Sequence, residues 1–115
     1  MAPAEYTIAT ATLQDLPFDD AAQAVAEAGF RHVELFVGPD HLDRWWLQPE
    51  RTRDRLAAYG LVTDSVHSPQ TGWDSDAVDE AARRASVAAA RESIVAAAAV
   101  GARLVVVHPN QRGHE

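Results

Sequence analysis

Short apolar runs alternate along the chain with longer stretches in which apolar residues recur at helical spacing. The short runs predict strands at Tyr6–Ala11, His32–Phe36, Leu61–Val66 and Leu104–Val107. The longer stretches predict helices that run from Pro17 to Gly29, from Pro49 to Gly60 and from Ser75 to Val100. Because strands and helices alternate, we expect parallel strands joined by right-handed helical crossovers.

Local signals support the helix boundaries. Proline is favourable in a first turn, and glycine is a natural helix C-cap, as at Gly29 and Gly60. Asp74, Ser75 or Asp76 is the expected N-cap of the third helix. The buried side of each helix is expected from its apolar spacing: Phe18, Ala22, Val25 and Ala28 in the first, Leu56 and Tyr59 in the second, and Val87, Ala90, Ile94 and Ala97 in the third. The aliphatic run of the fourth strand is expected to be buried on both faces.

Two of the strands lead into histidines. His67 follows the third strand and His108 the fourth, each close to a proline. Parallel α/β proteins place chemistry at the carboxyl ends of their strands, and histidine serves there as a metal ligand or acid–base group. Glu34 alternates with Val33 and Leu35, so its side chain is expected to face away from the helices, because an acid inside a strand is costly unless paired or coordinating.

The remaining candidates carry weaker predictions. His32 begins its strand at the opposite end of the sheet and is expected to be structural, whereas His41 is expected to be solvated in a loop. Asp64 is a candidate supporting group for the site. The tryptophans of the loops either wall a sugar pocket or cover the rim of the sheet, and they are Trp45, Trp46 and Trp73.

Composition narrows the classes of function. A chain of 115 residues with 47% hydrophobic content forms one domain at most. It has no cysteine, no lysine, no apolar run of membrane-spanning length and no visible signal peptide, so we expect a cytoplasmic protein without thiol, Schiff-base or disulfide chemistry. The formal net charge of −7 disfavours nucleic acid as a partner. The turn Thr12-Leu13-Gln14 carries no glycine-rich dinucleotide fingerprint, which disfavours a Rossmann fold.

Several motifs, taken together in order, resemble a known family. They are Ala28-Gly29-Phe30-Arg31-His32-Val33-Glu34-Leu35, Val66-His67-Ser68-Pro69, the helix start between Asp76 and Ser86, and Val100-Gly101-Ala102-Arg103-Leu104-Val105-Val106-Val107-His108-Pro109. The segment from Phe18 to Pro109 resembles the first half of the xylose isomerase-like TIM barrels, which include sugar phosphate isomerases and epimerases and, more distantly, endonuclease IV. A complete barrel has eight strands and about 250 residues. The expected fold class is therefore α/β, a partial (half) TIM barrel of about four parallel strands and three crossover helices, with residues 1–115 as the N-terminal half.

The resemblance also implies a function. It implies a metal-dependent sugar or sugar-phosphate isomerase or epimerase, in which His67 and His108 bind a divalent metal ion (Mn²⁺, Co²⁺, Zn²⁺ or Mg²⁺). Glu34 is then the catalytic carboxylate, and Trp45 and Trp73 contact the substrate. The family takes its other metal ligands from the later strands, so the half is expected to be inactive alone.

Two alternatives belong to other classes. An isolated half-barrel exposes an inner face and two sheet edges, which favours a module that completes a barrel by self-association or with a partner chain. An endonuclease IV-like phosphodiester hydrolase is less favoured, because the chain is acidic and lacks lysine. Neither a nucleic acid nor a membrane is an expected partner.

Overall fold

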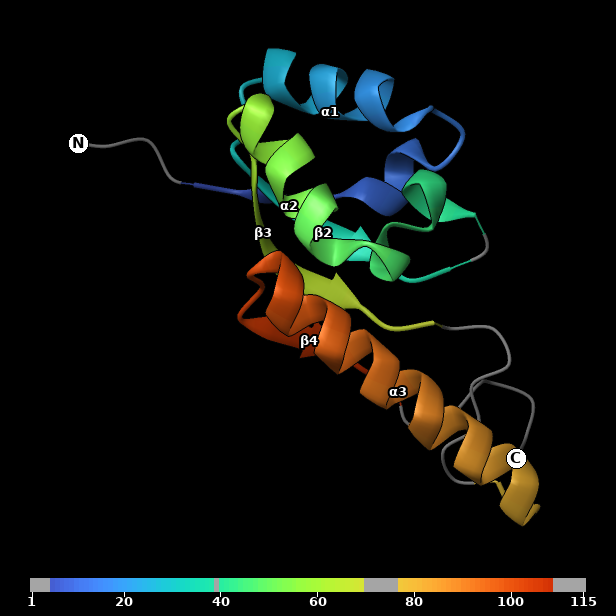
Figure 1. Cartoon of the computed structure of the whole chain (residues 1–115). Coiled ribbons are helices and arrows are strands. Elements are labelled where there is room, and N and C mark those ends of the chain that lie inside the picture. Colours follow the sequence, from blue (N-terminus) through green and yellow to red (C-terminus); the bar gives the residue numbers. More distant parts are fainter. Residues whose placement is uncertain (1–4, 39, 70–76, 109–115) are drawn as a thin grey trace.

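The computed structural model describes residues 5–38, 40–69 and 77–108. Its strands form one parallel sheet in the order β1-β2-β3-β4. The elements are β1 (Thr7–Ala9), the 3-10 helix η1 (Thr10–Leu13), α1 (Phe18–Glu27), β2 (His32–Phe36), the 3-10 helix η2 (His41–Leu47), α2 (Pro49–Ala58), β3 (Val62–His67), α3 (Glu80–Val100) and β4 (Leu104–Val106). This is the strand–helix alternation of a half TIM barrel, as predicted (Figure 1).

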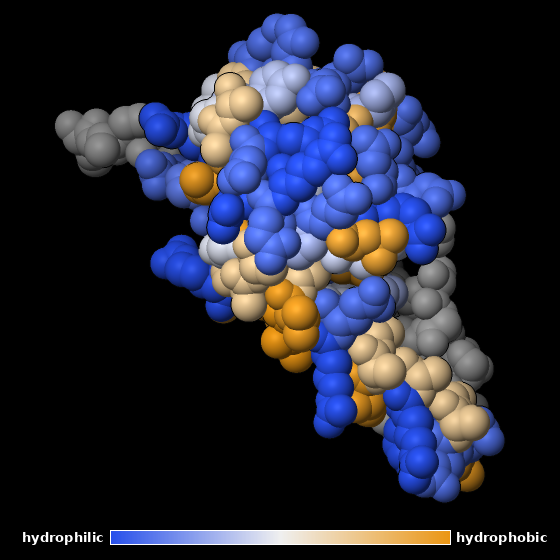
Figure 2. Space-filling model, in the orientation of Figure 1, coloured by the Kyte–Doolittle hydropathy of each residue, from blue (hydrophilic) through white to orange (hydrophobic). Residues whose placement is uncertain are grey.

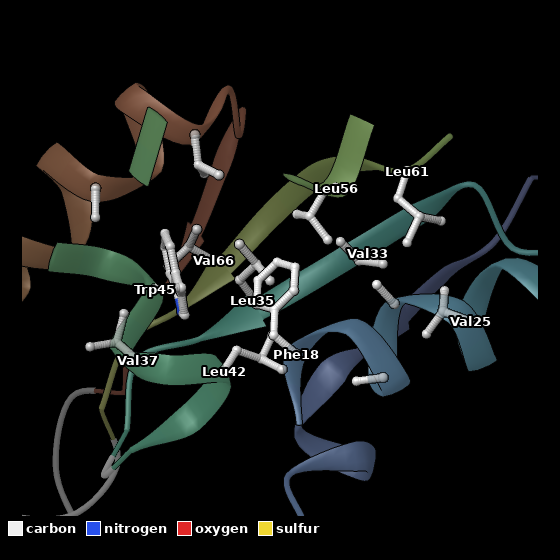
Figure 3. Close-up of a cluster of buried hydrophobic side chains, with 14 of the residues drawn as sticks. Phe18, Val25, Val33, Leu35, Val37, Leu42, Trp45, Leu56, Leu61 and Val66 are labelled. Carbon is white, nitrogen blue, oxygen red and sulfur yellow. The ribbon is translucent and has the colours of Figure 1, made fainter. Parts of the chain in front are cut away.

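The hydrophobic core lies between one face of the sheet and the three helices. Val33, Leu35 and Val66 of the strands are completely buried and cluster with residues of all three helices, among them Phe18 and Leu56 (Figure 3). Strand side chains alternate between faces, so the intervening residues of β2 and β3 face the other side of the sheet, here called the inner face. The core therefore determines which side chains are available for chemistry.

Helix α3 has a capping residue at each end. The side chain of Asp79 accepts a hydrogen bond from the backbone N–H of Ala82 at 2.8 Å, which satisfies one of the first orphan donors of α3. The predicted N-caps of this helix, residues 74–76, lie outside the described residues. Gly101 ends α3 with φ +93°, a left-handed conformation that glycine adopts without penalty.

The predicted buried stripe of α3 was largely wrong. Val87 is 44% exposed and Ile94 is 52% exposed, although Ala97 is buried as expected. The buried face instead runs through Ser86, Ser93, Ala96, Ala97 and Val100. Small side chains let the helix approach the sheet closely, and an alanine-rich helix offers several faces of similar hydropathy. Spacing alone therefore did not select the right one.

Three other local predictions also needed correction. Strand β1 is shorter than expected and passes directly into η1, whose Thr10 is buried, and Ala28 of the first helix is exposed. Strand β4 is not buried on both faces, since Leu104 is 65% exposed and Val106 37% exposed. Within the described residues β4 pairs with β3 alone, so nothing there covers these side chains on the inner face. In the described part of the chain, no helix is long and apolar enough to cross a membrane.

A β-bulge in β3 adjusts which residues face inward. Val33 pairs with Thr63 and Glu34 with Ser65, which leaves Asp64 as an extra residue. The bulge lets Thr63 face the helices while Ser65 and His67 face inward, an effect that bulges often have beside active sites. The sequence pattern did not reveal this bulge.

Candidate functional site

The inner face of the sheet gathers the polar side chains of three strands. Register places Glu34 beside Ala9 and Ser65 in one layer, and Phe36 beside His67 and Val106 in the next layer toward the carboxyl ends. His108 follows β4 at the same end. The structure thus brings together three of the predicted site residues: Glu34, His67 and His108.

Glu34 faces inward, as the alternation with Val33 and Leu35 predicted. The hydroxyl of Ser65 donates a hydrogen bond to Glu34 Oε2 at 2.7 Å. One carboxylate oxygen is thereby fixed by a neighbouring strand, and the side chain is held in a defined orientation. No local sequence pattern indicates this pairing, because the two residues are separated by 31 positions and meet only through the strand register.

The two strand-end histidines lie in direct contact. The Nε2 atoms of His67 and His108 are 3.1 Å apart and the ring centroids are 4.9 Å apart. Two nitrogens bound to one ion at about 2.05 Å lie about 2.9 Å apart at a right angle and about 3.3 Å apart at the tetrahedral angle. The observed separation is that of an N–H···N hydrogen bond between the rings, and it also falls between these values, so the two nitrogens are close enough to bind one metal ion.

Backbone contacts fix the orientation of His67. Its Nδ1 lies 2.9 Å from the carbonyl oxygen of Ser68, which can only accept, so the neutral ring carries its proton on Nδ1 and its lone pair on Nε2. Ser68 is in turn completely buried, and both its backbone N–H and its hydroxyl donate to the carbonyl of Val106. This serine links the carboxyl ends of β3 and β4, which keeps the two histidines at the same end of the sheet.

The described residues contain no complete metal site. No group of three or more His, Cys, Asp or Glu side chains there is close enough to hold a metal ion. Stable sites supply three or more protein ligands, so His67 and His108 fit a metal as part of a larger ligand set. That later strands contribute the other ligands stays a prediction from the family resemblance.

A cavity of about 370 Å³ opens on the inner face beside this site. It is lined by Ala9, Ala11, Gln14, Glu34, Phe36 and His67. The ring of Phe36 contacts that of His67 at a centroid distance of 5.6 Å, so it forms an apolar wall next to the imidazole. The same ring packs against Gly38, where any Cβ would collide with it.

At the amino ends of the strands, a separate polar layer occupies the inner face. Asp64 Oδ1 lies 3.0 Å from His32 Nδ1, and its other oxygen accepts a hydrogen bond from the Thr7 hydroxyl at 2.6 Å. The Thr7 hydrogen bond, together with His32, lowers the pKa of Asp64. Glu5 lies 3.2 Å from the other nitrogen of His32. His32 therefore lies at the end of the strand away from the site, as predicted, and Asp64 accompanies it.

His41 is buried, which contradicts the prediction of a solvated loop histidine. Its side chain is only 3% exposed, and Nε2 lies 2.9 Å from the Thr10 hydroxyl oxygen. That hydroxyl donates to the carbonyl of Glu34 at 2.8 Å, so it accepts from His41. The buried ring joins η1 and η2 above β2, and burial lowers its pKa. Sequence spacing could not have found this residue, because its partners lie on other elements.

The tryptophans do not line the inner-face cavity in the described residues. Trp45 is 2% exposed within the core between the sheet and helices, and its indole N–H donates to the carbonyl of Phe36 at 2.8 Å. Phe36 takes the place in the cavity wall that the sequence suggested for Trp45, whose role toward a substrate stays a prediction that this position does not favour. Trp73 lies outside the described residues.

Comparisons with known proteins agree with this architecture. The family model of the xylose isomerase-like TIM barrel matches residues 22–115. No curated protein matches the sequence significantly. Among solved structures, a D-tagatose 3-epimerase-like protein superposes with a TM-score of 0.72 at 21% identity, covering 93% of this chain and 38% of that one.

Two further solved structures show the same fold. A D-psicose 3-epimerase, solved in the presence of D-fructose, has a TM-score of 0.64 at 15% identity, over 89% of this chain and 36% of its own. A fusion of a xylose isomerase-like TIM barrel with a 4-hydroxyphenylpyruvate dioxygenase has a TM-score of 0.64 at 20% identity, over 96% of this chain and 18% of its own. The chain thus spans less than half the length of each of these three structures.

Proposed function

Because the chain belongs to the xylose isomerase-like TIM barrel family, we propose that it is part of a metal-dependent sugar or sugar-phosphate isomerase or epimerase. The observation that carries the proposal is the His67–His108 pair, whose Nε2 atoms are 3.1 Å apart at the carboxyl ends of β3 and β4. Two of the similar structures, a D-tagatose 3-epimerase-like protein and a D-psicose 3-epimerase, support a sugar as the substrate class.

In this proposal each inner-face residue has a defined task. His67 and His108 would hold a divalent ion through two nitrogen ligands, and such an ion would supply Lewis-acid polarisation of a sugar carbonyl and its neighbouring hydroxyl. Glu34 accepts a hydrogen bond from a sugar hydroxyl or takes a proton from it through one carboxylate oxygen, while the Ser65 hydroxyl donates to the other, Oε2. Phe36 gives the sugar ring an apolar surface beside His67. The remaining metal ligands and acid–base groups come from elements that these residues do not include.

Metal binding by the chain itself tests the proposal. We expect Co²⁺ to raise the melting temperature of the chain and to develop visible absorption bands, and both effects to be lost in His67→Gln and His108→Gln. His32→Gln is the matched control, because His32 lies at the other end of the sheet. Absence of any Co²⁺ effect in the wild-type chain, or an effect of wild-type size in both site variants, would contradict the metal site.

The sugar half of the proposal has its own readout. Adding D-fructose or a ketose phosphate to the Co²⁺-loaded chain is expected to shift the absorption bands, because sugar oxygens enter the coordination sphere. Glu34→Gln is expected to weaken that shift while leaving Co²⁺ binding unchanged. Bands that respond to neither sugar would overturn the substrate class and leave the metal site standing.

A second function is favoured by the exposed side chains of β4. Leu104 and Val106 face inward and are 65% and 37% exposed, which is unusual for the interior of a barrel. We propose that this face is covered in the working protein by further barrel strands, from a second copy or from a partner chain. This assembly is compatible with the enzymatic proposal, since the same strands bring the missing ligands.

A further inference from the structure

A second cavity lies away from the inner face, between η2 and the start of α2. Its volume is about 230 Å³, and it shares no lining residue with the inner-face cavity. The lining consists of Leu42, Asp43, Arg44, Trp45, Leu47, Gln48, Arg51, Thr52 and Arg55. Three arginines and one aspartate give this lining an excess of positive charge, although the whole chain carries a formal net charge of −7.

One of the three arginines already has partners. Arg55 contacts Asp19 at 3.3 Å and Asp43 at 3.5 Å, and its guanidinium lies 3.8 Å from the centre of the Phe18 ring. These contacts hold the side chain in place and direct the charge of Asp43 toward Arg55. Asp43, the one carboxylate in the cavity lining, is therefore paired with an arginine of the protein.

The other two arginines have no carboxylate partner in the described part of the chain. Arg51 donates to the amide oxygen of Gln48 at 3.1 Å, which orients it without neutralising it. The side chain of Arg44 makes neither a hydrogen bond nor an ion pair among the described residues. Guanidinium groups bind oxyanions through paired N–H donors, and two uncompensated ones at one cavity provide such donors.

The backbone around the cavity adds to this positive potential. Gln48 is the N-cap residue of α2 and Thr52 lies in its first turn, and this N-terminus has no side-chain cap in the described structure. The positive end of the helix dipole favours an anion at that position. This contribution is secondary to the arginines and acts in the same direction.

The loop that presents Arg44 has an unusual conformation. Leu42, Asp43 and Arg44 have φ values of 45°, 58° and 57°, which side chains other than glycine rarely adopt. Such conformations persist only where surrounding contacts hold them. Here Trp45 supplies these contacts, since its indole binds the Phe36 carbonyl and its own carbonyl accepts from Thr52 at 3.3 Å.

We propose that this cavity binds a phosphate-type oxyanion, either inorganic phosphate or the phosphate group of a small monoester. The guanidinium groups of Arg44 and Arg51 supply positive charge and hydrogen-bond donors, and the helix terminus adds positive potential. The negative charge of Asp43 is paired with Arg55. A volume near 230 Å³ is below the roughly 300–1,000 Å³ of pockets for drug-sized ligands, which suits a small anion. The site is separate from the sugar site proposed above and does not depend on it.

Titration of the full chain with inorganic phosphate, followed by ³¹P NMR and calorimetry, tests the site. Arg44→Gln and Arg51→Gln are each expected to weaken binding by about tenfold or more, since a charge-assisted hydrogen bond is lost. The control is Arg53→Gln, which removes one positive charge from α2, as Arg51→Gln does. Arg53 pairs with Asp54 at 3.2 Å and does not line this cavity.

The control gives the experiment its meaning. Unchanged affinity in Arg53→Gln, with loss in both cavity variants, supports the site. An equal loss in all three variants would show a general charge effect, and no binding by the wild-type chain at physiological salt would also overturn the proposal. Glycerol phosphate distinguishes the sources, because only a site open to monoesters binds it as well as free phosphate.

Discussion

At the scale of single residues, the polar groups around the site are ordered by hydrogen bonds that cross between elements. Thr10 donates to the backbone of β2 and accepts from His41, and Ser65 donates to Glu34. These bonds fix the tautomer of His41 and the orientation of the Glu34 carboxylate. His41 is the most constrained of them, because its Nε2 must donate to Thr10 and its Nδ1 is buried without a partner in the described structure.

Protonation of His41 is therefore expected to oppose folding. Burial lowers its pKa in the folded chain below the 6.5 of an unfolded histidine, so below pH 6.5 the unfolded chain binds the additional proton. The stability contributed by the neutral ring is complete above pH 6.5 and is lost as the pH falls below it. Urea denaturation at pH 7.5 and 5.5 should show a smaller loss for His41→Gln than for the wild type, by at most about 1.4 kcal/mol per pH unit.

Equal pH dependence in the two proteins would contradict this assignment, whatever their absolute stabilities. The comparison uses the difference between two pH values within each protein. A variant that is simply less stable therefore does not mimic the predicted effect.

Residue-scale predictions from the sequence succeeded where periodicity determines the outcome. Glu34 was expected to face away from the core because Val33 and Leu35 alternate with it, and both of these are completely buried. His41 was expected to be solvated and is buried. Its burial depends on Thr10, 31 positions earlier, and on the path of η2, neither of which a local pattern encodes.

At the scale of elements, local sequence patterns predict where the strands and helices lie, but not which side of a helix is buried. Strand β2 was predicted with its exact limits, and α2 and β3 differ from their predictions by only a residue or two. In α3 the burial of Ser86 and Ser93 in place of Val87 and Ile94 shows that close helix packing can outweigh hydropathy. The bulge at Asp64 is a similar case, since it arises from pairing with β2.

The N-terminus of α3 offers a test at this scale. Asp79 is its only side-chain cap in the described structure, so Asp79→Ala is expected to lower the free energy of unfolding by about 1 kcal/mol. Chemical denaturation followed by circular dichroism measures the change. Asp79→Ser is the matched control and is expected to retain most of the stability, because serine also caps. Equal losses in both variants would show that the cap bond contributes nothing.

At the scale of the whole molecule, the sheet has two unlike faces. One face is covered by α1, α2 and α3, and much of the helix side of the molecule is hydrophilic, with apolar side chains gathered along α3 (Figure 2). The inner face carries the histidine pair and the exposed Leu104 and Val106 together. The proposed ligand pair and the uncovered apolar surface thus lie on one side, so a single set of covering strands would cover the surface and bring the further ligands that the proposal requires.

Covering this face is expected to be measurable as association. Burying a leucine or valine side chain contributes about 1.5–3 kcal/mol, so the wild-type chain should self-associate with rising concentration in sedimentation velocity and bind a hydrophobic dye. Leu104→Glu should reduce both effects, because a carboxylate on the inner face opposes desolvation. Val78→Glu is the control, since Val78 is fully exposed just before α3. A wild-type chain that stays monomeric without binding dye, or equal effects of the two substitutions, would mean that the inner face is not an interface.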